Sequence, residues 1–136
     1  MLKHIFFASV VVSTLAAAAS CKVSRERQSL AFEAKDSLIY GAWTHSHEED
    51  QNDMRVYRRA GYKFPPSRGR EGMEFLSNGK LLYNAIGPTD APQNLPGTWG
   101  FSSKQTLHLT LESGRQFSYT LAKIEKDRMV GRWEEQ

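Results

Sequence analysis

The fold is decided by residues 107–121, which read LHLTLESGRQFSYTL. From Leu107 to Leu111 every second residue is leucine, and the polar residues His108 and Thr110 lie between them. After a Glu-Ser-Gly turn, a second run alternates Phe, Tyr and Leu with Ser and Thr. Such alternation is typical of strands with one buried face, and a short turn between two of them joins an antiparallel pair. The stretch therefore predicts a β-hairpin that packs on an apolar core.

The same pattern extends along the chain from residue 38 onwards. Short runs rich in Val, Leu, Tyr, Trp and Thr alternate with turn residues, which is a strand-and-hairpin signal. Asn78-Gly79 is the strongest hairpin signal among these turns. We predict strands at about 38–47, 54–59, 71–77, 80–86, 96–102, 105–112, 115–124 and 128–134.

These strands predict an all-β domain. Closure of an antiparallel sheet on itself removes its exposed edges. We therefore expect a small up-and-down antiparallel β-barrel of about eight strands, with a short N-terminal helix. A flattened two-sheet sandwich stays open as the alternative. The expected divisions are a signal segment at 1–20, a tether and short helix at 21–37, and the barrel domain at 38–136.

Each of the tryptophans follows a glycine by two positions. Residues two apart share a face of a strand, and a glycine there lets the strand bend or lets a large ring pass over it. The segment from Leu38 to Trp43 resembles the Gly-x-Trp signature on the first strand of lipocalins and related calycin barrels. This resemblance implies a lipocalin-like barrel, in which the tryptophans either plug the core or contact a ligand. The signature residues are Gly41, Trp43, Gly97, Trp99, Gly131 and Trp133.

The longer segment from Trp43 to Trp99 carries a second resemblance. It looks like a family of small bacterial proteins with lipocalin-like barrels and no established activity. The resemblance implies a fold and no reaction. The motifs that carry it are His45-Ser46-His47-Glu48-Glu49-Asp50, Val56-Tyr57-Arg58, Phe64-Pro65-Pro66-Ser67-Arg68-Gly69-Arg70, Ile86-Gly87-Pro88-Thr89-Asp90 and Gly97-Thr98-Trp99.

The first residues have the order of a bacterial secretory signal. Lys3 gives a basic start, residues 5–19 are apolar or small, and Cys21 is the single cysteine. Small residues before a lone Cys resemble the lipobox of bacterial lipoproteins, which implies lipid attachment at Cys21. A transmembrane anchor is disfavoured, because a spanning helix needs roughly 20 apolar residues. Cleavage without lipidation stays open, because Ala18 stands where a lipobox usually has Leu.

This N-terminus predicts a monomer that is anchored to a membrane of the bacterial cell envelope through its lipid. Lys22 follows the cysteine, whereas Asp there would be the inner-membrane retention signal of enteric bacteria. In a cell with two membranes we therefore expect the outer one. The net charge of +3 reflects a small excess of Lys and Arg without a polybasic tract, so no nucleic-acid partner is expected. A single cysteine allows no internal disulfide.

A ligand site is expected at the barrel end that carries the two longest non-strand segments, around Pro65-Pro66 and at 87–96. Arg68 and Arg70 would hold a carboxylate or phosphate of a small molecule through their planar guanidinium groups. The apolar surface of this site would come from Tyr57, Phe64 and Trp99. The competing interpretation, which we favour, is that these arginines pair with acidic residues, as do the others of the basic stretch with Arg55, Arg58, Arg59 and Lys63. The acidic residues are Glu48, Glu49, Asp50, Asp53, Glu71 and Glu74.

Two histidines are candidate metal ligands. His45 and His47 share one face of the first predicted strand and precede three acidic residues. Imidazole and carboxylate groups both bind zinc, but a solvated strand end with an acidic turn is favoured, so we expect no metal or other cofactor. No serine lies in a nucleophile-elbow pattern, and no Gly-rich phosphate loop opens a helix. The chain is therefore not expected to be an enzyme.

Two functions of different classes follow from this barrel. An eight-stranded barrel is just wide enough to hold one small ligand, and ligands enter at barrel mouths. The first function, which we favour, is therefore a lipocalin-like protein that binds a small apolar or acidic ligand in the cell envelope. The second is a structural or protein-interaction module whose barrel is filled by its own aromatic side chains.

Overall fold

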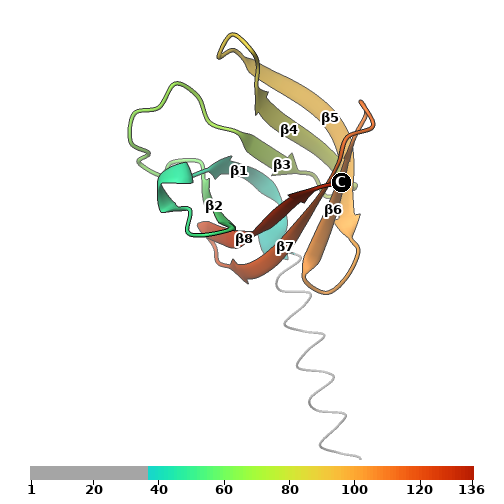
Figure 1. Ribbon diagram of the computed structural model, residues 1–136. Coiled ribbons are helices and arrows are strands. Elements are labelled where there is room, and N and C mark those ends of the chain that lie inside the picture. Colours follow the sequence, from blue (N-terminus) through green and yellow to red (C-terminus); the bar gives the residue numbers. More distant parts are fainter. Residues whose placement is uncertain (1–36) are drawn as a thin grey trace, which may run out of the picture. The chain divides into compact units, whose positions relative to one another are not determined.

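The computed structural model describes residues 37–136, which form a closed antiparallel β-barrel (Figure 1). These residues belong to one unit of the chain, Glu33–Gln136. The expected all-β barrel of about eight strands is confirmed. The signal segment 1–20, Cys21 and the tether 22–36 lie outside the described residues.

The barrel is built almost wholly from strands. Within the described chain, helix is limited to a turn at 37–39 and to the short 3-10 helix η1 (His47–Glu49). The strands are β1 (Gly41–His45), β2 (Met54–Arg59), β3 (Gly72–Phe75), β4 (Lys80–Ile86), β5 (Pro92–Phe101), β6 (Thr106–Leu111), β7 (Gln116–Ile124) and β8 (Arg128–Glu135).

The strand order departs from the chain order at one place. Strands β3 to β8 follow one another around the barrel, but β1 lies between β2 and β3, and β8 pairs with β2. Trp43 of β1 thus pairs with Arg59 on one side and with Met73 on the other. Because β2 and β3 are both antiparallel to β1, they run in the same direction. Residues 60–71, here called the crossover segment, must therefore pass from one end of the barrel to the other.

The barrel has two ends that carry different connections. The proximal end is where the described chain begins at Ser37, and it also carries 60–63, 76–79, 102–105 and 125–127. The distal end carries η1, 87–91, 112–115 and the C-terminal Gln136. In Figure 1 the turns after β5 and β7 lie low in the view, near the start of β1, and the turn after β4 lies at the top.

Strand β5 is longer than the sequence predicted. Residues 87–96 were expected to be a long connection, but β5 begins at Pro92 and leaves only the turn 87–91. The Trp99 amide donates to the carbonyl of Gly79, just before β4, so the even-numbered residues of β5 direct their backbone groups away from β4. Pro92 and Pro96 occupy such positions, where no partner on β4 needs their missing N–H. The prolines are therefore compatible with a strand.

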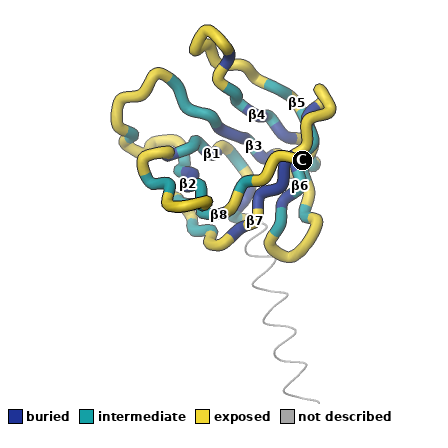
Figure 2. The backbone as a smooth tube through the Cα atoms, viewed as in Figure 1, coloured by how far each residue is buried: buried dark blue, intermediate teal, exposed yellow. Residues whose placement is uncertain are grey.

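The interior of the barrel is filled by apolar side chains. Every second residue of β6 is buried, as its leucine pattern predicted, and Phe117, Tyr119 and Leu121 of β7 share the buried face. Figure 2 shows the buried positions along the strands and the exposed ones in the turns. The largest side chains that are less than 2% exposed are Trp43, Tyr57, Tyr119, Phe75 and Phe117.

The glycines of the Gly-x-Trp units lie where a side chain does not fit. Gly41 has a φ of +96°, a left-handed conformation that favours glycine. A Cβ at Gly131 would lie 2.8 Å from the ring of Tyr119, so this ring passes directly over the glycine. Of the tryptophans, Trp43 is 1% exposed, whereas Trp99 and Trp133 are partly buried against the core.

Candidate functional site

The residues predicted to bind a ligand do not lie in one place. Tyr57 is buried inside the barrel, whereas Trp99 lies near the proximal end, where its ring contacts Tyr40. Phe64, Arg68 and Arg70 belong to the crossover segment. Only Phe64 and Arg70 are brought together, with the guanidinium of Arg70 above the ring at 4.6 Å from its centroid.

Arg70 is held by a set of groups at the distal end. Its Nη1 donates to a carboxylate oxygen of Glu48 at 2.8 Å, and its Nη2 donates to the other oxygen of that carboxylate and to the Pro65 carbonyl at 2.7 Å. The hydrogen bonds from Arg70 lower the pKa of the Glu48 carboxyl to about 2. The Arg70 side chain is only 11% exposed, so its fork is occupied by the protein itself.

The other arginines near the acidic block are mostly paired as well. Arg58 donates two hydrogen bonds to the Glu49 carboxylate, at 2.6 and 2.8 Å. Further ion pairs join Arg55 to Glu71 and Arg132 to Asp53. The favoured pairing of the basic stretch with nearby acidic residues is thus confirmed for Arg55, Arg58 and Arg70. Arg68 is exposed and forms no ion pair within residues 37–136.

The two histidines do not converge on a common point for a metal. Nε2 of His45 lies 2.8 Å from a carboxylate oxygen of Asp50, and the ring stacks on Tyr57. His47 contacts Arg70 through Nδ1 and Glu48 through Nε2. Among the described residues, no group of three or more His, Cys, Asp or Glu side chains is arranged to hold a metal ion.

Aromatic rings occupy the space where a lipocalin-like ligand would lie. Tyr57 contacts Tyr119 edge to face, with ring centroids 5.5 Å apart, and the ring centroids of Phe117 and Trp133 are 4.9 Å apart. Tyr83 stacks against Phe117 at 5.6 Å. Burial raises the pKa of the Tyr83 hydroxyl to about 12 and raises that of Tyr57 and Tyr119 further. These hydroxyls therefore stay neutral at physiological pH.

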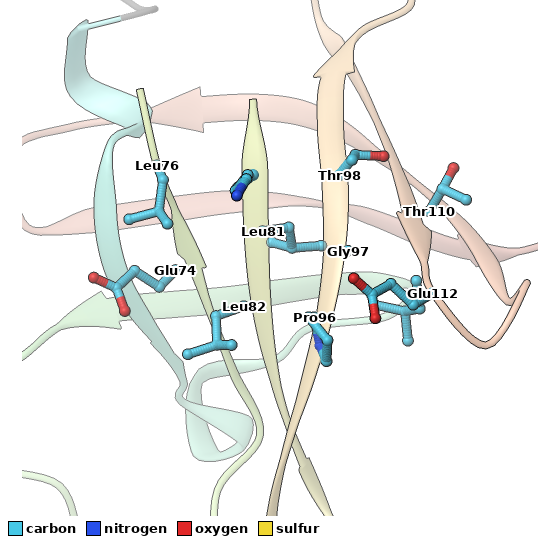
Figure 3. A pocket seen from close by; sticks show the side chains of 11 residues that line it. Glu74, Leu76, Leu81, Leu82, Pro96, Gly97, Thr98, Thr110 and Glu112 are labelled. Carbon is cyan, nitrogen blue, oxygen red and sulfur yellow. The ribbon is translucent and has the colours of Figure 1, made fainter. Parts of the chain in front are cut away.

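The outer wall of the barrel carries a shallow groove with a volume of about 390 Å³. Figure 3 shows Leu82 and Pro96 between the carboxylates of Glu74 and Glu112. On β4, Leu82 alternates with the buried Leu81 and Tyr83, so its side chain faces outward. The groove is lined by Glu74, Leu76, Lys80, Leu81, Leu82, Pro96, Gly97, Thr98, Thr110, Leu111 and Glu112.

Sequence reasoning missed the role of Arg59. Its guanidinium lies over the Trp43 ring, 3.8 Å from the centroid, and donates to the backbone carbonyls of Leu38 at 2.5 Å and Tyr40 at 2.7 Å. A third bond reaches the Lys126 carbonyl at 3.3 Å. Arg59 therefore ties the entering chain to β2 and to the β7–β8 turn. In the sequence, Arg59 is one of several basic residues between 55 and 70, and nothing there distinguishes it from the others.

Comparison of the whole chain with protein-family models, with curated protein sequences and with solved structures finds no match.

Proposed function

We propose that this protein is a non-enzymatic interaction module at the bacterial cell envelope, with a filled barrel and a lipid anchor on Cys21. The observation that carries the proposal is the packing of the barrel interior. Trp43, Tyr57, Phe75, Phe117 and Tyr119 are each 1% exposed or less. Interiors packed with interlocking side chains exclude further molecules, because few voids larger than a water molecule remain.

A partner would then meet the outside of the barrel. The groove across β3 to β6 offers an apolar floor of Leu82 and Pro96 between Glu74 and Glu112. Apolar surface rimmed by charges is typical of sites that contact other proteins. Arg70 and Arg58, which could have held an acidic small molecule, are already engaged by Glu48 and Glu49.

The proposed anchor rests on the sequence alone. The apolar run before Cys21 and the small residues that precede it are typical of lipoprotein signals. Among residues 37–136, no helix is long and apolar enough to span a membrane.

The filled barrel predicts that an apolar fluorescent probe will not be taken up in a saturable way. The measurement is a titration of the protein with the probe, following both probe emission and tryptophan fluorescence. Because Trp43 is buried in the interior, a probe that entered the barrel would quench it. Saturable uptake with such quenching would refute the filled barrel and favour the lipocalin-like binder, the second function that the fold allows.

The lipid anchor predicts that the chain incorporates a labelled lipid precursor in a bacterial host, and that a Cys21→Ser variant does not. Sulfur is the atom that forms the thioether to the lipid, so replacing it with oxygen removes the attachment point. Equal expression of both chains, checked by immunoblot, is the control. Equal labelling of both would show that Cys21 is not the anchor.

A further inference from the structure

The lysines of residues 37–136 all lie at or near the proximal end of the barrel. Each connection at that end that follows a strand contains a lysine or is directly followed by one. All are exposed, and only Lys123 has an ion-pair partner within the described chain, at 2.8 Å from Glu125. The residues are Lys63 after β2, Lys80 at the start of β4, Lys104 between β5 and β6, and Lys123 and Lys126 around the β7–β8 turn.

Most of the acidic residues lie elsewhere. In the described chain, Glu125 and Asp127 are the carboxylates of the proximal connections, and Asp127 lies 3.7 Å from Arg58. The other carboxylates lie on the wall or toward the distal end, at Glu48, Glu49, Asp50, Asp53, Glu71, Glu74, Asp90, Glu112, Glu134 and Glu135. The charge of this nearly neutral protein is thus separated along the barrel, with the positive side at the proximal end.

Large side chains of amphipathic or apolar character lie among the lysines. Tyr40, Tyr62 and Leu76 are each 39% exposed, and they belong to proximal segments of the chain. Trp99 contacts Tyr40 edge to face, with ring centroids 5.7 Å apart. Tyrosine and tryptophan rings favour the boundary between lipid headgroups and water, and lysines there attract anionic lipids.

We propose that the proximal end of the barrel docks on the anionic headgroups of a lipid bilayer. The described chain enters the barrel at this same end, at Ser37. The biological setting rests on the proposed lipid anchor, but the docking itself comes from the lysines and rings of the barrel. Contact through this end would leave the distal end of the barrel, with η1 and the C-terminal Gln136, facing away from the bilayer.

The test uses residues 22–136, which lack both the signal segment and Cys21. This chain contains all eight strands and the whole hydrophobic core of the barrel, from Ile39 to Trp133. Co-sedimentation is measured with vesicles of phosphatidylcholine containing about one third phosphatidylglycerol, and with pure phosphatidylcholine. We expect binding to the anionic vesicles only, and weaker binding as salt is raised, because salt screens exposed charges.

Two double variants with the same change in net charge distinguish docking through the proximal end from attraction of the whole protein to anionic vesicles by its net charge. Lys104→Gln with Lys126→Gln removes two proximal charges and is expected to weaken binding roughly tenfold or more, since each lysine near an anionic surface contributes about a factor of five. Arg68→Gln with Arg115→Gln removes two charges at the distal end and is expected to leave binding within about twofold. Thermal unfolding confirms that each chain is folded.

Two results would overturn the proposal. Equal weakening by both double variants would show that only the net charge matters. Binding to inorganic polyphosphate without binding to the anionic vesicles would show that the lysines serve a soluble polyanion. Lipid labelling at Cys21 is unaffected by either result, so failure of docking is distinguishable from failure of the proposed anchor.

Discussion

Replacing Arg59 with alanine is expected to lower the free energy of unfolding by about 3 kcal/mol, because several interactions are lost at once. The guanidinium covers the Trp43 ring and donates to the carbonyls of Leu38, Tyr40 and Lys126. A partly exposed cation over an aromatic ring, as Arg59 is, contributes about 0.5–1 kcal/mol, and hydrogen bonds from a charged donor add about as much or more each. Urea unfolding followed by tryptophan fluorescence measures the change.

Arg68→Ala is the matched control for this variant. Arg68 is exposed and forms no ion pair among the described residues, so its replacement is expected to change stability by less than about 0.5 kcal/mol. Arg59→Lys should recover only part of the loss, because an ammonium group cannot make the same forked set of hydrogen bonds. Equal stability of the Arg59→Ala and Arg68→Ala chains would contradict the role assigned to Arg59.

Gly131→Ala is expected to destabilise the barrel by about 3 kcal/mol or to prevent folding, because the new methyl group has no space. Its Cβ would overlap the Thr120 carbonyl oxygen and lie 2.8 Å from the Tyr119 ring. Tyr119 is fully buried, and its hydroxyl donates to the Arg55 carbonyl at 3.0 Å, so the ring cannot move aside without losing that bond. Thermal and urea unfolding of the two chains give the difference.

Gly100→Ala provides the comparison within the same barrel. No atom lies within 4 Å of a Cβ at Gly100, and its φ is not in the left-handed region. Alanine there is expected to leave stability unchanged or to raise it by about 0.5 kcal/mol, by restricting the unfolded chain. If both alanine variants were equally stable, the close passage of Tyr119 over Gly131 would not be required by the fold.

Most of the barrel could be predicted from local sequence, because hairpins are local. The Asn78-Gly79 turn joins β3 to β4, and the alternating leucines of 107–111 with the Ser113-Gly114 turn place β6 next to β7. The position of β1 between β2 and β3 could not be predicted, because pairing between distant strands leaves no mark in either strand. The start of β5 was missed because Pro92 and Pro96 break strands in most settings.

The candidate site was harder to predict than the fold. Arg68 and Arg70 are separated by one residue, yet one is exposed and the other is enclosed by Glu48, Pro65 and Phe64. That difference depends on where the crossover segment meets η1, which sequence spacing does not specify. The pairing of the arginines with carboxylates was predictable, because blocks of opposite charge lie close together along the chain.

The passage of the chain from β2 to β3 also has a consequence for how the barrel assembles. Hairpins from β3 to β8 close through short turns, whereas two seams must join distant residues, Trp43 with Met73 and Val56 with Val130. When distant segments pair, the chain loses loop entropy before the new contacts stabilise it, so we expect these two seams to close last. The rigid Pro65-Pro66 step limits the number of conformations that residues 60–71 can adopt before the barrel closes. We therefore expect the length and stiffness of residues 60–71, which contribute no strand to the finished barrel, to affect how fast β1 pairs with β3.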